Sequence, residues 1–326
     1  MNCSSNKNVV PQDMIQLLDE EELEHAARCS YQYLLKSISK DESERPTKEL
    51  RDRLAMDMAK RFLISESGNK KKALARMKKT IIFRKDMNID GIRLCYSDLS
   101  DNNLEYKALR SAIDREFETP VWQFRGQDMQ NRAPVSAIIA EKKDGRFHPE
   151  NYLKVHLYVM EKALACGERL SGGRGDYQYV VYSDCRYFIL SLAPPIGLTK
   201  RMTHTLNDHY PEALHRFYLV DSPAIFRIFW NLVKPFIDPK IKAKVVFVTG
   251  EVSFIWRNIF TLSNVSLTKN PLSCVSNIQE QRKEIFSGLI KADQTMPFTL
   301  PDGKKISKFD ARKALYEIPF DHLYEE

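Results

Sequence analysis

The sequence predicts an α/β protein in which an N-terminal helical subdomain precedes a mixed, largely parallel sheet flanked by helices. Two observations support this prediction. Residues 12–118 have apolar positions at helical spacing and few β-rich runs, whereas beyond residue 119 short β-rich runs alternate with helical segments. Alternating strands and helices favour parallel pairing, because neighbouring parallel strands need a long crossover connection.

Composition limits the classes of function. The chain has 326 residues, 50 Lys and Arg against 43 Asp and Glu, and a formal net charge of +7. Its 12 Gly and 15 Pro exclude collagen-like and low-complexity classes. The charge is too small and dispersed to predict a nucleic-acid partner, but it is compatible with an acidic membrane surface.

The chain is expected to be cytoplasmic. No run of about 18 apolar residues predicts a membrane-spanning helix, and residues 1–11 lack the apolar core of a signal peptide. The six cysteines are far apart with no Cys-x-x-Cys pair, so we expect reduced thiols and no metal site. They are Cys3, Cys29, Cys95, Cys166, Cys185 and Cys274.

The helical subdomain is expected over residues 12–118. Pro46 favours a helix start at the following residue, and Leu74, Met77 and Ile81 lie at helical spacing. The expected helices cover residues 19–38, 47–64, 70–83 and 104–117.

The sheet and its helices are expected over residues 119–250. Expected strands cover residues 120–124, 134–140, 177–183, 215–220 and 244–248, and expected helices cover residues 148–170, 199–208 and 223–234. Residues 251–326 form a less regular C-terminal extension, with helices expected only over 279–291 and 308–316.

The segment 223–234 is apolar over most of a helical circumference. Ser222 is expected to cap it and Pro223 to occupy its first turn. Three interpretations remain open: a core helix of the sheet, a lid over an apolar pocket, or a segment that inserts into a membrane. A basic edge follows, which suits an anionic bilayer but is also typical of a solvated face. It consists of Lys234, Lys240, Lys242 and Lys244.

A specific signature runs through the same region. It comprises His209-Tyr210-Pro211-Glu212, Phe217-Tyr218, Pro223, the run from Val233 to Pro239, and Lys244-Val245. In order and spacing it resembles the Sec14-like lipid-transfer proteins of the CRAL-TRIO family. Arg61-Phe62-Leu63, followed by a basic helix ending in Phe83-Arg84-Lys85, resembles the N-terminal part of that family from about residue 45.

The resemblance implies an apolar pocket between the sheet and a movable gate helix, which holds one lipid or other hydrophobic small molecule and exchanges it at membranes. It implies no catalytic residue, cofactor or metal. The expected ligand-binding residues are Glu212, Lys244, Phe217, Leu219 and Tyr182. The expected gate residues are Phe226, Phe229, Trp230, Val233 and Phe236, and the expected membrane contacts are Lys234, Lys240 and Lys242. Strand periodicity places Phe217 and Leu219 on one face, without indicating which face meets the lipid.

The chain departs from the family members that bind phosphatidylinositol. Glu212 and Lys244 match two headgroup positions, but Ala213, Ile241 and Ile64 stand where those members have Arg, Thr and Arg. A phosphate needs charge-assisted donors. We therefore expect a less charged ligand, such as a sterol, a tocopherol-like or carotenoid-like molecule, or another phospholipid, at least as readily as phosphatidylinositol.

Other interpretations stay open. A bound lipid could gate a signalling contact with a protein partner through residues 251–326. Less favoured is a small-molecule enzyme built on Asp184, Asp221 and His209, since Asp184 and Asp221 follow expected strands. The basic run at 70–79 is either a solvated helix face or a membrane contact. Its residues are Lys70, Lys71, Lys72, Arg76, Lys78 and Lys79.

Overall fold

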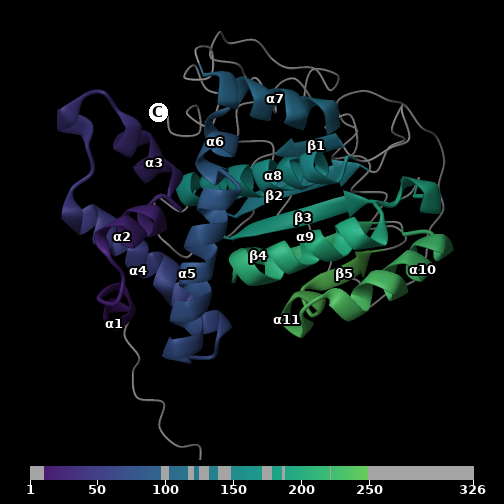
Figure 1. Ribbon diagram of the computed structural model, residues 1–326. Helices are drawn as coiled ribbons and strands as arrows, with labels where there is room; N and C mark the ends of the chain where they lie inside the picture. Colours follow the sequence, from purple (N-terminus) through teal and green to yellow (C-terminus); the bar gives the residue numbers. More distant parts are fainter. Residues whose placement is uncertain are drawn as a thin grey trace, which may run out of the picture.

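The computed structural model describes residues 11–96, 103–116, 121–124, 132–138, 148–170, 178–185, 188–220 and 222–248. Helices form the N-terminal part and a five-stranded sheet with its crossover helices forms the rest (Figure 1). The α/β class predicted from the sequence is confirmed. The helices expected over 279–291 and 308–316 lie outside the described residues.

The N-terminal part is built from helices, several of which begin at a side-chain cap. The Thr47 hydroxyl accepts a hydrogen bond from the Leu50 amide and begins α4, and the Asn69 side chain does the same for α5. The α-helices are α1 (Gln12–Ile15), α2 (Glu20–Ala27), α3 (Tyr31–Ile38), α4 (Lys48–Ser65), α5 (Lys70–Asp86), α6 (Ile89–Leu94) and α7 (Leu104–Glu116).

The single helix expected over 19–38 is wrong, because the chain breaks it at Ser30. The Ser30 backbone is extended, and its hydroxyl accepts the Tyr33 amide at 3.1 Å, which starts α3 afresh. Helix α6 was not predicted. It begins at Asn88, whose left-handed φ of 47° and side-chain bond to the Gly91 amide stop α5 and start a new helix.

The sheet has strand order β1-β2-β3-β4-β5, with β1 antiparallel to β2 and the remaining neighbours parallel. The strands are β1 (Val121–Phe124), β2 (Ala133–Ile138), β3 (Tyr179–Asp184), β4 (Leu214–Val220) and β5 (Val245–Val248). The connections carry α8 (Pro149–Leu170), α9 (Ile196–His209), α10 (Ala224–Val233) and α11 (Pro239–Lys242), with 3-10 turns η3 (Leu190–Leu192) and η4 (Lys234–Phe236).

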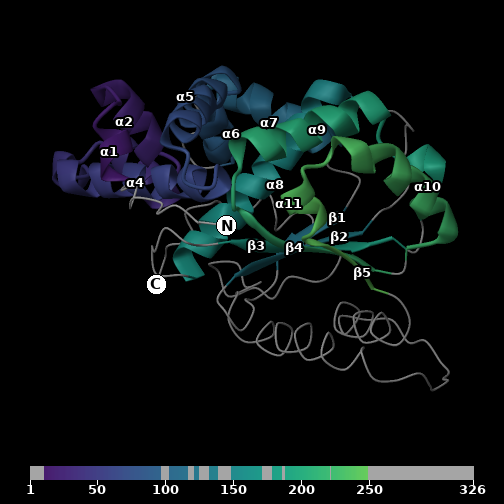
Figure 2. The same ribbon diagram turned by 90° about the horizontal axis from the view of Figure 1, so that it is seen from below.

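This strand order places the crossover helices on one face. Each parallel strand is added beside the one before it, and right-handed crossovers then put all connecting helices on the same side of the sheet. Figure 2 shows α8, α9 and α10 on that side. Val181, Phe217 and Val245 are successive register partners, so they share this helix-covered face. Val181 packs against the cluster around α8, and the other two pack against the cluster around α10.

Two of the buried cores among the described residues include N-terminal helices. One lies within α1, α2, α4 and α5 and includes Met14, Ala59, Phe62 and Met77. The other joins α3 and α6 to α7, α8 and the sheet, with Tyr31 and Tyr158 fully buried. The second core continues from the helical part into the sheet part without a break. Within the described residues, no helix is both long and apolar enough to span a bilayer.

Candidate functional site

Helix α10 lies against the helix-covered face at the β4 and β5 side of the sheet. It starts after Pro223 without a side-chain cap, so the expected cap at Ser222 is wrong. The Ser222 hydroxyl is buried and has no hydrogen-bond partner in the described structure. The helix runs into η4, where Pro235 continues the turn.

The inner face of α10 is an aromatic cluster. Phe226 is only 5% exposed. Its ring centroid lies 5.0 Å from that of Phe188, 5.9 Å from Phe229 and 6.3 Å from Phe247. Trp230 meets Phe247 edge-on at 5.6 Å. These are the edge-to-face geometries that aromatic rings favour, so the cluster holds α10 through apolar contact.

The sheet residues expected to touch a ligand lie partly under this cluster. Leu219 is buried in it, and Phe217 packs against it together with Val245. Tyr182 is in register with Tyr218, which puts it one residue out of step with Phe217 and Leu219. The Tyr182 side chain is not among those described. The structure therefore brings Phe217 and Leu219 together with gate residues.

The two remaining predicted gate residues, Val233 and Phe236, differ from each other in their surroundings. Val233 is buried, as its place on the inner face requires. Phe236 follows the helix in η4, where the Lys200 ammonium lies 4.8 Å from its ring centroid. Phe188, in the segment before η3, was not predicted, although its ring contacts both Phe226 and Phe229 in the aromatic cluster.

The outer face of α10 is also apolar. Ile228 is 54% exposed and Leu232 is 53% exposed, one helical turn apart. A helix with buried aromatic side chains on one side and exposed aliphatic side chains on the other can exchange an aqueous surrounding for an apolar one. This property distinguishes α10 from an ordinary core helix.

The basic edge after α10 is partly uncompensated. Lys234 and Lys242 have no carboxylate within ion-pair distance in the part of the chain that the structure describes. Lys240 instead donates a hydrogen bond to the Ser65 carbonyl at 2.5 Å, which ties α11 to the end of α4.

Glu212 and Lys244 form a half-buried ion pair, with Nζ 3.4 Å from Oε2. The Lys244 ammonium also donates to the Leu214 carbonyl at 2.8 Å. Glu212 has a left-handed φ of 55°, and its backbone carbonyl accepts a hydrogen bond from the side-chain Nε2 of Gln178 at 2.9 Å. The two residues expected to meet a headgroup are therefore bonded to each other.

The three positions that depart from the phosphatidylinositol-binding pattern carry no polar side chain. Ala213 is buried, Ile64 is exposed and Ile241 is partly buried. None of them can donate a hydrogen bond to a phosphate.

The basic run on α5 is largely neutralised. Arg76 pairs with Glu66 at 2.6 Å, and Lys78 pairs with Glu22 at 2.6 Å. Lys70 and Lys79 pair with Asp13 and Asp208. These pairs hold the helical part together, which favours the solvated structural face over a membrane contact.

A small cavity with both polar and apolar lining residues lies where the helical part meets the sheet part. Its volume is about 50 Å³, which is enough for a few water molecules but far too small for a lipid. Its lining includes Arg61, Arg84, Glu161, His209, Tyr210 and Ala213.

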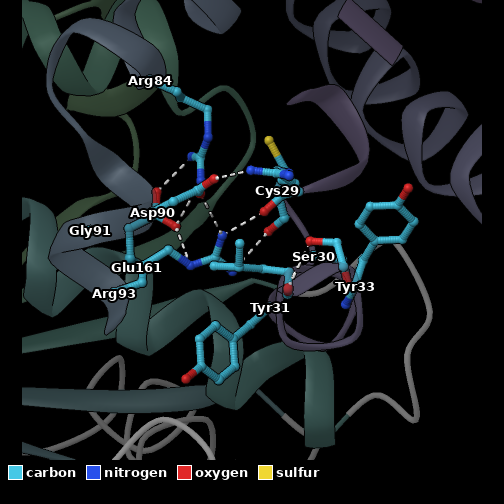
Figure 3. Close-up of polar contacts among 12 residues, drawn as sticks. Cys29, Ser30, Tyr31, Tyr33, Arg84, Asp90, Gly91, Arg93 and Glu161 are labelled. Atoms are coloured by element: carbon cyan, nitrogen blue, oxygen red, sulfur yellow. Dashed lines mark hydrogen bonds and ion pairs between the residues drawn. The ribbon is translucent and has the colours of Figure 1, made fainter. Parts of the chain in front are cut away.

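A buried polar network crosses the same junction (Figure 3). Glu161 on α8 binds Arg84 on α5 and accepts a hydrogen bond from the Tyr210 hydroxyl at 2.8 Å. Arg93 approaches Glu161 at 3.4 Å. Burial alone raises the pKa of Glu161, but the charges of Arg84 and Arg93 outweigh burial and hold the pKa below its ordinary value. The network therefore connects α5 of the helical part to α8 and Tyr210 of the sheet part.

The proposed enzyme constellation is not assembled. His209 ends α9 and so lies toward the end of the sheet where β4 begins, whereas Asp184 lies at the opposite end, where β3 finishes. The His209 ring stacks on Phe83 with the ring centroids 3.9 Å apart, and the Nδ1 atom of His209 lies 3.0 Å from the Thr80 hydroxyl. Asp221 lies outside the described residues. No group of three or more potential metal ligands occurs in the described part of the chain.

Comparison with known proteins agrees with this architecture. The CRAL/TRIO domain family model matches residues 120–255. Patellin-3 of Arabidopsis thaliana is 24% identical over 57% of this chain and 36% of its own length. The phosphatidylinositol transfer protein PDR17 of Saccharomyces cerevisiae is 25% identical over 57% of this chain and 50% of its own. CRAL-TRIO domain-containing protein C3H8.02 of Schizosaccharomyces pombe is 29% identical over 57% and 39%.

The chain thus spans between about a third and a half of the length of these relatives. The crystal structure of Sfh5 superposes with a TM-score of 0.53 at 16% identity, covering 75% of this chain and 82% of that one. At that identity the superposition shows a shared fold. Domain match, relatives and fold agree with the signature between His209 and Val245. Residues 120–255 therefore carry a CRAL/TRIO domain, and the chain is similar to Sec14-like proteins.

Proposed function

We propose that the chain is a non-enzymatic lipid carrier that holds one hydrophobic ligand between α10 and the sheet and exchanges it at membrane surfaces. The observation that carries this proposal is the two-sided apolar character of α10. Phe226 is buried against Leu219 on the inside, while Ile228 and Leu232 face outward and are exposed.

The physical need for such a carrier follows from the cost of exposing a lipid. Each methylene in water costs about 0.8 kcal/mol, so a sixteen-carbon chain costs about 12 kcal/mol. A carrier must offer equivalent apolar surface and must cover it in transit. No bond is broken, so neither a nucleophile nor a cofactor is required.

The contacts of α10 suit a cover that opens. The described contacts between its inner face and the sheet are made by apolar side chains, among them Phe226, Trp230, Leu219 and Phe247. Apolar contacts are non-directional, so a lipid chain can replace the aromatic rings without leaving a buried polar group unsatisfied. Pro223 and Pro235 flank the helix as fixed points of the chain.

The ligand class follows from the polar residues nearby. Lys244 is bound to Glu212 and the Leu214 carbonyl, and Ile64, Ala213 and Ile241 supply no donor. A headgroup that needs several charge-assisted donors would have to break the Lys244 pair. We therefore infer an uncharged or weakly charged lipid. The name of PDR17 assigns phosphatidylinositol transfer to that protein, and its headgroup need not be shared here.

The proposed setting is the cytoplasm, with transient membrane contact. We keep the division at residues 12–118, 119–250 and 251–326 as a proposal. A contact with a protein partner through residues 251–326 remains a proposal, because that segment lies outside the described residues.

Native mass spectrometry of protein purified from its own cells tests the proposal, together with a transfer assay between vesicles. We expect one bound lipid per chain and transfer above the spontaneous rate. Phe247 is 41% exposed, so the fold should tolerate a charged side chain at this position. Phe247→Glu places that charge beside Trp230 on the inner face of α10, so it should lower lipid loading several-fold. Ile82→Glu, at a 59% exposed position on α5, is the control. A chain that neither holds nor transfers any lipid contradicts the proposal.

A further inference from the structure

Exposed aliphatic side chains gather at the α10 end of the molecule. They belong to three separate segments and are between 39% and 54% exposed. Two lie on the outer face of α10, two at the start of η3 and one at the start of α9. They are Ile228, Leu232, Ile189, Leu190 and Ile196.

Buried aromatic contacts fix these segments beside each other. Phe188, directly before Ile189, is buried with its ring centroid 5.0 Å from Phe226 and 5.4 Å from Phe229. On the α10 wheel, Phe229 lies next to Leu232, so the side of α10 that meets Phe188 adjoins its exposed stripe. Figures 1 and 2 both show α9 running alongside α10 at this end.

The surroundings of this surface are basic. Residues 188–200 contain no acidic residue, and residues 222–248 contain only Asp238, whose side chain caps α11. Arg227, Lys200 and Lys234 are exposed, and none has an ion-pair partner within the described ranges. An aliphatic centre with a positive margin is complementary to an anionic bilayer, whose headgroups carry the charge and whose acyl chains accept the aliphatic groups.

We propose that the η3 segment and the first turn of α9 form a second, fixed half of the membrane-docking surface, beside the movable half on α10. The partner is an anionic phospholipid bilayer. The inference rests on the proposed carrier function and adds a surface to it. Ile189, Leu190 and Ile196 anchor the protein, while Ile228 and Leu232 travel with the gate.

This arrangement has a mechanical consequence. If docking depended on α10 alone, opening that helix would shift the only apolar contact with the bilayer. The Phe188 amide donates to the carbonyl of Cys185, directly after β3, at 3.0 Å, so Ile189 and Leu190 follow a residue that is tied to the sheet. A contact through Ile189 and Leu190 can then keep the protein on the bilayer while α10 moves, so the uncovered ligand site stays against lipid rather than water. The aliphatic side chains are half exposed already, so docking at this position requires no refolding of η3.

Vesicle flotation tests the proposal, with phosphatidylcholine vesicles containing about one third phosphatidylserine. The η3 variant is Ile189→Ser with Leu190→Ser, and the gate variant is Ile228→Ser with Leu232→Ser. The matched control, Ile82→Ser with Leu104→Ser, removes two exposed aliphatic side chains from α5 and α7. We expect the η3 and gate variants each to lose about tenfold or more in partitioning, and the control to lose less than twofold.

Lipid loading, measured by native mass spectrometry on the same proteins, separates this inference from the carrier function. We expect the η3 variant to retain its lipid, since Ile189 and Leu190 face solvent. Selective loss of vesicle binding in that variant supports the inference even if no lipid is found in any form. An η3 variant that floats as well as the unchanged protein overturns it, as does an unchanged protein that does not float. Equal losses in the η3 variant and the control also overturn it.

Discussion

Arg84 on α5 and Glu161 on α8 form a buried, two-pronged ion pair across the junction of the helical and sheet parts. The Nη1 atom lies 2.7 Å from Oε1, and the Nη2 atom lies 3.2 Å from Oε2. Side-chain exposure is 8% for Arg84 and 1% for Glu161. The planar fork of a guanidinium matches a carboxylate in this way, so the pair fixes the orientation of α5 on α8 as well as its position.

Removing the charge of Glu161 should destabilise the protein strongly. Glu161→Gln leaves Arg84 buried with no counter-charge in this pair, and losing one partner of a buried ion pair costs about 3–5 kcal/mol. Urea unfolding measures this loss. Glu21→Gln is the control, because its pair with Lys85 at 2.5 Å is exposed to solvent and should contribute far less to stability. Similar losses in both variants would contradict a special role for the junction.

A second buried carboxylate of α8, that of Glu168, binds the start of α3. Glu168 accepts the Tyr31 amide at 2.9 Å and the Ser30 hydroxyl. Neither carboxylate contact was predictable from the sequence, because Ser30 and Arg84 are 138 and 77 residues away from their partners. In the sequence, nothing distinguishes Glu161 and Glu168 from the other polar residues of α8.

Protonation of His209 should make stability depend on pH. Burial is the largest effect, and Lys79, Arg76 and Arg84 of α5 add to it against the attraction of Asp208, so the pKa of His209 falls to about 4. An unfolded histidine binds its proton near pH 6.5. Between these values the unfolded state holds more protons, so stability falls as pH falls from 6.5 toward 4.

His209→Gln removes a group that lets the unfolded state bind up to one more proton than the folded state. The free energy of unfolding should then change less steeply between pH 6.5 and 5, by at most about 1.4 kcal/mol per pH unit. Urea unfolding at several pH values measures it. His156 keeps a slope of the same sign, because burial lowers its pKa to about 4 as well. An unchanged slope in His209→Gln would show that His209 does not contribute.

The bounds of α10 could be predicted from the sequence, whereas the sheet face that it covers and its contact with Phe188 could not. Pro223 and the apolar period of residues 223–234 are local signals, and they place α10 to within a residue or two. Which face of the sheet it covers depends on strand order and crossover handedness, and these are properties of the whole chain. Phe188 was missed because it lies in an irregular segment, where no period marks an inward-facing side chain.

Shortening Phe226 should loosen the gate. Phe226→Ala removes the ring that meets Phe188, Phe229 and Phe247, and deleting a buried phenylalanine ring costs about 3–5 kcal/mol. The closed position of α10 should therefore weaken, and lipid release to acceptor vesicles should accelerate about tenfold or more. Stopped-flow transfer of a fluorescent lipid measures the rate. Ile228→Ala, on the exposed face of the same helix, should not accelerate release from the protein. Equal rates in the two variants would count against an aromatic latch.

The basic edge after α10 and the paired lysines of α5 should differ in their contribution to membrane binding. Lys234 and Lys242 have no carboxylate partner in the described structure, whereas Lys78 and Lys85 pair with Glu22 and Glu21. An unpaired lysine near an anionic surface contributes about 1 kcal/mol. Lys234→Gln with Lys242→Gln should then weaken binding to phosphatidylserine-containing vesicles about 30-fold at low salt.

Lys78→Gln with Lys85→Gln changes the net charge by the same amount and should weaken binding far less. The difference should shrink toward 1 M salt, where the screening length falls to about 3 Å. Flotation over a salt series measures both effects. Equal losses in the two double variants would mean that net charge, and not the position of the lysines beside α10, decides membrane binding.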